Sequence, residues 1–256
     1  MILLSRRPDD EWRRPAELRE LMSNYATVQA LTFDLFGTIL DLGGSLTPPL
    51  VPFLQAKGAT ITADGFWAQW RDRQRIEQYQ DTLLMLGHSG YLETARRAFV
   101  YTLRRNKIDA TADEVAMFML NWQQLVPFPD VMPALERLQV RYKLVALSNG
   151  EPDFLQHLAD NRIRWRFDAI FSVNQVGAFK PHPAVYRGAA LYLGLEANQC
   201  LMVSSNAFDA VGARACGYRA IYVNRYGLPV EDHPCQPDQI VQDFTQLADA
   251  LLEPTP

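Results

Sequence analysis

Five short β-rich runs, most of them separated by helical patterns, limit the possible folds of this chain more than any other feature. The runs are ALTFDLF (30–36), KLVALSN (143–149), FDAIFSV (167–173), CLMVSS (200–205) and RAIYVNR (219–225). Helical spacing of apolar residues is found at 152–161, 183–195 and 207–217. Apolar strands that alternate with amphipathic helices are typical of a parallel sheet covered on both faces. The sequence therefore predicts an α/β fold with a doubly wound, Rossmann-like parallel sheet.

The long interval between the first two runs breaks this alternation. Residues 44–127 contain no convincing strand, and helical spacing is found there at 63–86, 91–106 and 112–125. A crossover between parallel strands needs only about a dozen residues, so this interval is predicted to be an inserted helical cap. The core then comprises residues 28–43 and 128–256. An insertion after the first strand lies over the sheet edge where α/β proteins bind ligands.

The charge-rich residues 1–27 form a separate N-terminal extension in this division. Their sequence, which includes RRPDDEWRRPAELRE, is compatible with a helix lying outside the main core. It is equally compatible with an upstream start, because Met22 opens the segment that leads into the first strand. Both interpretations stay open at this point.

Composition excludes several classes of partner. The chain has 256 residues, 48% of them hydrophobic, which is enough for a sizeable core. Its 25 basic residues are dispersed among 29 acidic ones, so no basic stripe suggests nucleic acid. No apolar run reaches the roughly 20 residues of a membrane span, and no lysine-rich face suggests a membrane surface. Three cysteines without metal-ligand spacing favour a reducing, cytoplasmic location.

Polar residues gather where the predicted strands end. Because the carboxyl ends of parallel strands share one crevice, these residues are expected to lie together. An aspartate near a lysine stays ionised at neutral pH and can act as a covalent nucleophile. There is no Ser-His-Asp arrangement and no histidine or cysteine nucleophile among them. The set consists of Asp34, Thr38, Ser148, Asn149, Lys180, Ser204, Ser205, Asn206 and Asp209.

Four segments in this order resemble the motifs of the haloacid dehalogenase superfamily, and look closest to its type II 2-haloacid dehalogenases. They are FDLFGTILD, LSNG, FKPHPAVY and SSNAFD, and the resemblance covers about residues 30–225. Four motifs in order are a far stronger signal than any one of them. The resemblance implies that Asp34 is the nucleophile, that Ser148 and Lys180 bind the substrate anion, and that Asp209 lies beside the nucleophile.

Two departures from the superfamily's phosphatases indicate which chemistry is expected. Those phosphatases resemble this chain but carry a second aspartate two residues after the nucleophile, where this sequence has Phe36. Phenylalanine cannot transfer a proton. At the start of the fourth motif, Ser204 and Ser205 stand where an acidic residue would hold Mg²⁺. A carbon–halogen bond needs neither device, because halide leaves without a proton. We therefore expect no metal and no cofactor.

The same resemblance implies an aspartyl-ester mechanism acting on a small halogenated carboxylic acid. Asp34 would attack C2 and displace halide, and water oriented by Asp209 would then hydrolyse the ester. Lys180, Ser204 and Asn206 would surround that water, and Thr38 would orient the nucleophile. The resemblance also suggests a homodimer. The residues predicted to surround the substrate and halide, beyond Ser148, are Arg71, Asn149, Phe208, Tyr186, Tyr91 and Phe36.

Structural interpretations remain open beside these functional ones. An aspartate at a strand end often bonds a turn, and one near a helix start favours the helix dipole. Most helix arginines are solvated or paired, and aromatic residues such as Phe36 and Tyr91 fill core volume. Three hypotheses follow for the whole chain: a 2-haloacid dehalogenase, a divergent phosphatase acting on a small phosphate ester, or a binding protein without catalysis.

Overall fold

The protein contains a parallel sheet of six strands in the order β5-β4-β1-β6-β7-β8. The computed structural model describes residues 25–84 and 88–252, so residues 1–24 of the predicted extension lie outside the described residues. Each of the five predicted runs contains a strand, and the predicted fold class is confirmed. The strands are β1 (Ala30–Phe33), β4 (Lys143–Ser148), β5 (Ala169–Ser172), β6 (Cys200–Ser204), β7 (Arg219–Val223) and β8 (Gln239–Val241).

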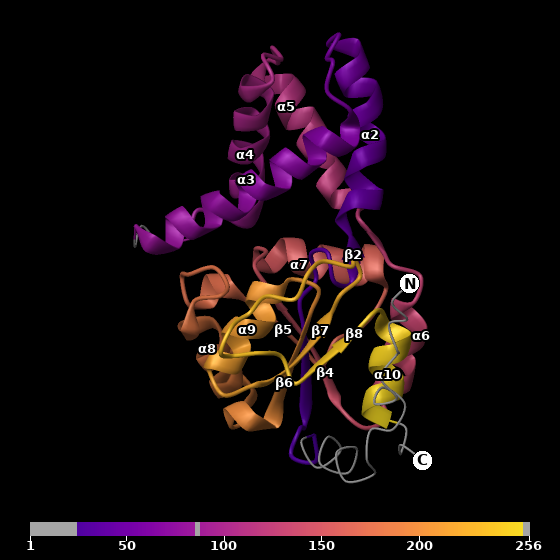
Figure 1. Cartoon of the computed structure of the whole chain (residues 1–256), viewed down its shortest axis with the longest axis vertical. Helices are drawn as coiled ribbons and strands as arrows, with labels where there is room; N and C mark the ends of the chain where they lie inside the picture. Colours follow the sequence, from indigo (N-terminus) through magenta and orange to yellow (C-terminus); the bar gives the residue numbers. More distant parts are fainter. Residues whose placement is uncertain (1–24, 85–87, 253–256) are drawn as a thin grey trace, which may run out of the picture.

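Helices cover both faces of this sheet. The helices α6 (Val131–Leu138) and α10 (Phe244–Leu252) pack against each other on one face, and α8 (Pro183–Leu193) and α9 (Ala207–Ala215) lie on the other (Figure 1). The helix α7 (Pro152–Leu158) packs beside β5. Short helical turns complete the layer at η3 (Ala159–Ile163), η4 (Val173–Gln175) and η5 (Ala197–Gln199).

The strand order creates a crevice next to β1. The chain runs from β1 outward to β4 and β5, and then returns to β6 on the other side of β1. All the pairings in this sheet are parallel, and every residue of β1 and β6 is buried. The connections that follow β1 and β6 therefore diverge at the carboxyl edge, where such sheets bind ligands.

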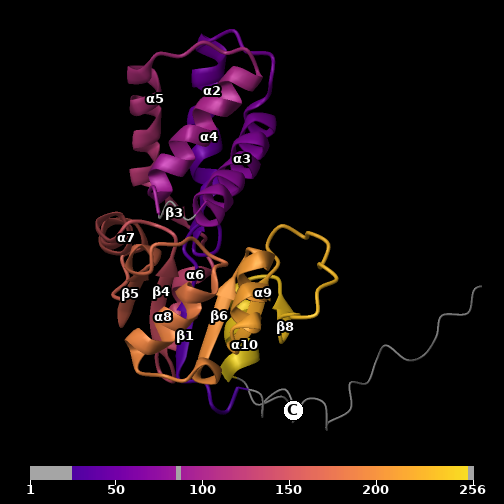
Figure 2. The same ribbon diagram turned by 90° about the vertical axis from the view of Figure 1, so that its left-hand side faces the viewer.

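A layer of helices stands above this carboxyl edge (Figures 1 and 2). Its interior is aromatic, and the buried Trp70 side chain donates its Nε1–H to the Ala95 carbonyl oxygen at 2.7 Å. Within residues 25–84 and 88–252, no helix is long and apolar enough to cross a membrane. The helices of the layer are α2 (Leu42–Ala56), α3 (Ala63–Leu83), α4 (Tyr91–Arg105), α5 (Ala112–Met119) and η2 (Leu120–Gln124).

The base of this layer differs from the sequence prediction. Residues 44–127 were expected to lack strands, but β3 (Val126–Pro127) pairs antiparallel with β2 (Leu40–Asp41). The prediction was wrong there because two-residue strands leave no periodic pattern in a sequence. The two strands form a short ribbon where the chain leaves the core and returns to it. The Val126 amide N–H also donates to Ser45 Oγ at 3.0 Å, which ties the ribbon to α2.

Candidate active site

The turn after β1 places the Asp34 carboxylate at the centre of the crevice. The Asp34 amide N–H donates to the Val203 carbonyl oxygen at 3.0 Å, which extends the β1–β6 pairing by one residue. The Leu35 carbonyl oxygen then accepts from the amides of residues 38, 39 and 40. Gly37 has a φ of +85°, which favours glycine. This tight turn returns Thr38 to the side chain of Asp34.

The two oxygens of Asp34 have different surroundings. Oδ2 accepts two hydrogen bonds, from Thr38 Oγ1 at 2.9 Å and from Asn206 Nδ2 at 2.8 Å. Oδ1 accepts one, from Lys180 Nζ at 3.0 Å. The Thr38 hydroxyl in turn accepts from the Ser205 amide at 2.8 Å, which fixes its direction. The carboxylate is therefore held from both sides, and Oδ1 retains the greater accepting capacity.

Lys180 joins the two aspartates of the site. Its Nζ donates to Asp34 Oδ1 at 3.0 Å, to Asp209 Oδ2 at 2.7 Å and to the Leu147 carbonyl oxygen at 2.9 Å. The Lys180 side chain is 2% exposed, and those of Asp34 and Asp209 are 6% and 1% exposed. An ammonium group has three N–H donors, so all the donors of Lys180 are occupied within the protein.

The protonation states of Lys180 and Asp209 depend on the charges around them. Burial alone would lower the pKa of Lys180, but the charges of Asp209 and Asp34 raise it, so the lysine stays protonated. Burial raises the pKa of Asp209, and the negative charge of Asp34 adds to this, while Lys180 opposes it. Two carboxylates and one ammonium leave one negative charge, which would repel an anionic substrate unless further cations lie nearby.

Tyr186 holds the other oxygen of Asp209. Its hydroxyl lies 2.7 Å from Asp209 Oδ1 and 3.2 Å from the Asp209 carbonyl oxygen. Burial, and then the charge of Asp209, raises the pKa of Tyr186, so the phenol remains a donor at neutral pH. Asp209 lies in the first turn of α9, where the helix dipole also favours a carboxylate.

An aromatic wall closes the site beside the nucleophile. The Phe36 ring stacks on the Tyr91 ring, with centroids 4.0 Å apart and an interplanar angle of 8°. Phe154 and Trp122 pack around Phe36 at centroid distances of 5.8 and 6.3 Å. Burial raises the pKa of Tyr91 to about 12. This wall holds no group that transfers a proton near neutral pH.

The helix α3 of the upper layer supplies the cations that the crevice lacks. Arg71 donates to Gln74 Oε1 at 2.9 Å and to Tyr91 Oη at 3.4 Å. Arg75, one turn further along, lies with Nη2 3.4 Å from Asn206 Oδ1. Sequence reasoning missed Arg75 and Gln78. Their spacing of four and seven residues from Arg71 puts them on the same helix face, and this spacing was the available signal.

A small cavity lies where these side chains meet. Its free volume is about 10 Å³, room for about one water molecule. Most of the predicted site residues line it, together with the two that were missed. The lining residues are Asp34, Phe36, Arg71, Arg75, Gln78, Tyr91, Asn149, Lys180, Asn206, Phe208 and Asp209.

Four predicted residues lie behind this lining rather than on it. Thr38 and Tyr186 contact Asp34 and Asp209 from behind, as described above. Ser204 Oγ accepts from the Asn206 amide at 3.1 Å and so orients the residue that touches Asp34. Ser148 ends β4, and its buried hydroxyl has no hydrogen-bond partner.

Asn149 connects the core to the upper layer. Its Oδ1 accepts from the Lys180 amide at 3.0 Å, and its Nδ2 donates to Gln78 Oε1 at 3.1 Å. Phe208, at the start of α9, packs its ring edge to face against Tyr79 of α3, with centroids 6.0 Å apart. These contacts fix the position of α3 over the crevice.

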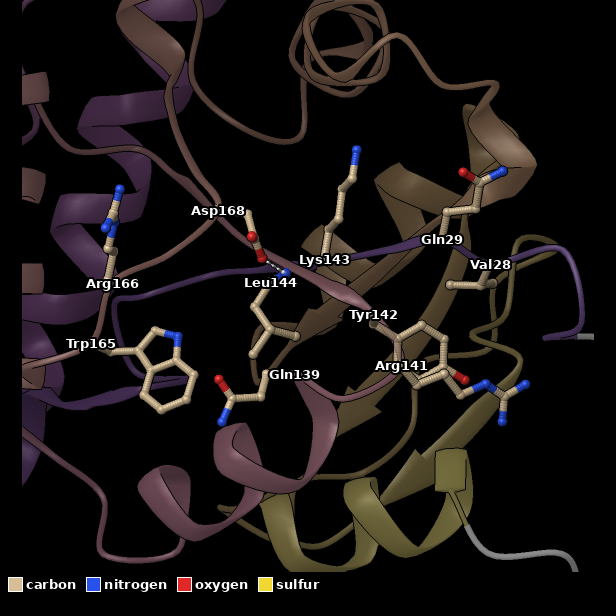
Figure 3. Close-up of a pocket in the computed structure, with 10 residues that line it drawn as sticks. All are labelled: Val28, Gln29, Gln139, Arg141, Tyr142, Lys143, Leu144, Trp165, Arg166 and Asp168. Carbon is tan, nitrogen blue, oxygen red and sulfur yellow. Dashed lines mark hydrogen bonds between the residues drawn. The ribbon is translucent and has the colours of Figure 1, made fainter.

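A much larger cavity lies elsewhere. It has a volume of about 510 Å³ and lies at the amino ends of the strands, where Gln29 precedes β1 and Lys143 begins β4 (Figure 3). Its carboxylate, Asp168, already accepts from the Leu144 amide at 2.7 Å. Among the described residues that line it there is no second carboxylate, whereas the small cavity combines two carboxylates with three cations. The chemistry therefore points to the small cavity.

Residues 28–217 match the haloacid dehalogenase-like hydrolase family. The chain belongs to this family. The haloacetate dehalogenase H-2 of Moraxella sp. (strain B) is 30% identical over 213 residues, which are 82% of this chain and 92% of the relative. The (S)-2-haloacid dehalogenase of Pseudomonas sp. (strain YL) is 32% identical over 213 residues, 82% of this chain and 89% of the relative.

A solved structure supports this membership. The L-2-haloacid dehalogenase of Xanthobacter autotrophicus, with chloropropionic acid covalently bound, superposes with a TM-score of 0.74 at 26% identity. The match covers 86% of this chain and 97% of the solved one. The resemblance to the haloacid dehalogenase branch of the superfamily is thus confirmed. Among the residues that the structure describes, no three His, Cys, Asp or Glu side chains are grouped as a metal site.

Proposed function

We propose that this hydrolase removes halide from short 2-haloalkanoic acids, L-2-haloacids or haloacetates, and produces 2-hydroxy acids. The observation that carries the proposal is the Asp34 carboxylate, held by Lys180 beside an aromatic wall that offers no proton. The names of the relatives, a haloacetate dehalogenase and an (S)-2-haloacid dehalogenase, support the same substrate class.

In the first step, Asp34 Oδ1 attacks C2 of the haloacid. A carbon–oxygen bond forms as the carbon–halogen bond breaks, and the halide keeps the bonding electron pair. Thr38 and Asn206 hold Oδ2, so Oδ1 is the oxygen with a free lone pair to donate. The halide is a weak base, so its departure needs no general acid, which agrees with Phe36 next to the nucleophile.

In the second step, water attacks the ester carbonyl carbon of Asp34. Asp209 accepts a proton from that water, and the bond between Cγ and Oδ1 of Asp34 breaks. The leaving oxygen takes up the proton from Asp209, which releases the 2-hydroxy acid, and the water's other proton passes to solvent as the Asp34 carboxylate is restored. Thr38 and Asn206 donate to Oδ2, the carbonyl oxygen of the ester, and stabilise the negative charge that develops there, while Lys180 lies beside Oδ1, the oxygen that leaves. The covalently bound chloropropionic acid in the Xanthobacter structure supports an intermediate of this kind.

The domain arrangement belongs to the proposal as well. Residues 44–127 form a cap over a core of residues 28–43 and 128–256, and residues 1–27 are an extension. The cap carries Arg71 to the site, so its closure would exclude water from the first step. We further propose a cytoplasmic homodimer. Its support is the family resemblance and the free state of Cys200, Cys216 and Cys235, and light scattering of the purified protein tests the dimer.

Halide release from chloroacetate and 2-chloropropionate in excess EDTA tests the activity. We expect release without added metal, and a strict Mg²⁺ requirement with turnover of small phosphate esters would instead favour a phosphatase. A single turnover in ¹⁸O-water tests the ester. Attack by Asp34 gives a first product with unlabelled oxygen, whereas direct attack by water labels it. Tight haloacid binding without any halide release would indicate a binding protein.

A further inference from the structure

Lys180 has no donor left for the carboxylate of a substrate. Its three N–H groups bond Asp34 Oδ1, Asp209 Oδ2 and the Leu147 carbonyl oxygen. Any substrate oxygen that bonded Lys180 would have to displace one of these buried acceptors, which is costly for a charged pair. The carboxylate of a haloacid therefore needs other donors, and a further cation among them would also offset the net negative charge of the group formed by Asp34, Lys180 and Asp209.

Arg75 is a cation in the cavity that has no assigned partner of opposite charge there. Toward the site, its Nη2 is 3.4 Å from the neutral Asn206 Oδ1. Its contact with a carboxylate, Asp72, is 3.9 Å long, and the Asp72 side chain is 77% exposed. Such an exposed pair contributes little. Burial and then the neighbouring Arg71 lower the pKa of Arg75, so an anion between them would relieve their repulsion.

Two residues of the cavity lining have a buried N–H donor that finds no acceptor within the described part of the chain. One donor is Arg75 Nε, and the other is Nε2 of Gln78, which is 3% exposed and three residues further along α3. Both residues line the cavity. A carboxylate has two oxygens that each accept hydrogen bonds, so it matches this pair of unsatisfied donors.

The position of Arg75 also fits a carboxylate better than a halide. Asn206 lies between Arg75 and Asp34, and it bonds both. In an in-line displacement the leaving halide lies on the far side of C2 from the attacking oxygen, whereas the carboxylate on C2 lies to one side. Arg75 is beside the nucleophile. Arg71 instead contacts Tyr91, on the aromatic wall.

The charge balance of the cavity also supports separate roles for Arg75 and Arg71. The lining of the cavity holds three cations and two carboxylates, which leaves one positive charge for one substrate anion. We propose that Arg75, together with Gln78, binds the substrate carboxylate, and that this leaves Arg71 for the departing halide. This inference rests on the proposed dehalogenase function, and it names the group that selects 2-haloacids over uncharged haloalkanes.

Equilibrium binding of two probes tests whether Arg75 binds the carboxylate and Arg71 binds the halide, without requiring turnover. Acetate carries the carboxylate without a halogen, and bromide is a halide without a carboxylate. In Arg75→Gln we expect the dissociation constant for acetate, measured by calorimetry, to rise about 10- to 100-fold, while that for bromide changes less than about twofold. Arg71→Gln should show the opposite pattern. Arg104→Gln, an exposed arginine on α4, removes the same charge outside the cavity and should change neither.

Unchanged acetate binding in Arg75→Gln, or an equal loss for both probes, would overturn the inference. If Arg75→Gln does not fold, Arg75→Lys replaces it. Lysine keeps the charge but lacks the forked donors, so acetate binding should weaken about fivefold and bromide binding should stay unchanged. Halide release by the wild type distinguishes the two proposals. If the wild type releases no halide from haloacids, the proposed function is wrong. If the wild type is active but the variants do not change acetate and bromide binding as expected, only this inference is wrong.

Discussion

The core half and the cap half of the site differ in how far their polar groups are satisfied. In the core, Lys180 uses all three donors, and Asp34 and Asp209 accept from named partners at both oxygens. In the cap, Arg75 Nε and the amide nitrogens of Gln74 and Gln78 are buried without acceptors. Buried donors are nearly always paired. The charged groups of the core are therefore paired before substrate binds, although the hydroxyls of Ser148 and Ser205 are not, whereas the cap keeps donors, one of them on a charged group, for the substrate.

Removal of the Asp34 charge should have the largest effect, and it tests whether the core carries the chemistry. Asp34→Asn keeps the shape of the side chain but removes the anionic nucleophile. We expect halide release from chloroacetate to fall by about 10⁴-fold or more. Asp153→Asn, on the exposed surface of α7, should keep wild-type rates. Substantial activity in Asp34→Asn would mean that water attacks the substrate directly.

Removal of the lysine should affect stability as well as rate. Lys180→Met leaves two buried carboxylates without their cation, and we expect a loss of about 3–5 kcal/mol in the free energy of unfolding. Burial already raises the pKa of Asp209, and Lys180 opposes that rise. Without the lysine the folded protein binds protons more strongly than the unfolded chain, so the deficit should shrink as the pH falls.

Thermal melts of Lys180→Met and wild type between pH 5 and pH 8 measure this dependence. The difference in melting temperature should be largest at the alkaline end. A difference independent of pH would show that the carboxylates do not depend on Lys180 for their charge. Lys107→Met, in the turn after α4, serves as a control for the loss of a lysine far from the site.

The third effect should appear in the pH profile. The Tyr186 hydroxyl lowers the pKa of Asp209 by donating to it, against the raising effect of burial. Tyr186→Phe should therefore raise that pKa, so that Asp209 becomes protonated and inactive at a higher pH. We expect the acid limb of ester hydrolysis to move up by about one pH unit. Tyr192→Phe, an exposed tyrosine on α8, should leave the profile in place.

The smallest effect is expected in the cap. Tyr91→Phe keeps the stacking on Phe36 and removes one long contact, 3.4 Å, with Arg71. We expect the KM for chloroacetate to rise about two- to fivefold, with kcat nearly constant, because a contact of this length is weak. Steady-state kinetics measure the two constants separately. A large fall in kcat with unchanged KM would place Tyr91 in the chemical step and remove the distinction between the two halves.

The sequence predicted the core better than the cap, for physical reasons. Asp34, Lys180 and Asp209 follow strand ends in a parallel sheet, and that topology alone brings them together. The cap helix α2 was not predicted because it contains Pro48, Pro49 and Pro52. Leucines at every fourth position bury one face of α2, and Pro48 and Pro52 are exposed, so water can satisfy the carbonyl oxygens that lose a donor.

The other features of the site could not be predicted from the sequence, because they depend on tertiary packing. Arg75 was indistinguishable from a solvated helix arginine until α3 was placed over Asn206. Ser148 and Asn149 are adjacent in the sequence, but only Asn149 lines the cavity, because successive residues at a strand end point in different directions. Residue identity and strand order predict which groups meet, and the side-chain directions need the packed structure.

The cavity beneath α3 has room for one water molecule but not for a haloacid. Entry of a substrate would therefore require α3 to move away from the core, and release of the halide would require the same movement. A non-covalent intermediate would be lost at that moment. An ester on Asp34 stays covalently bound while α3 is displaced. The halide can therefore leave and water can enter without loss of the reaction intermediate.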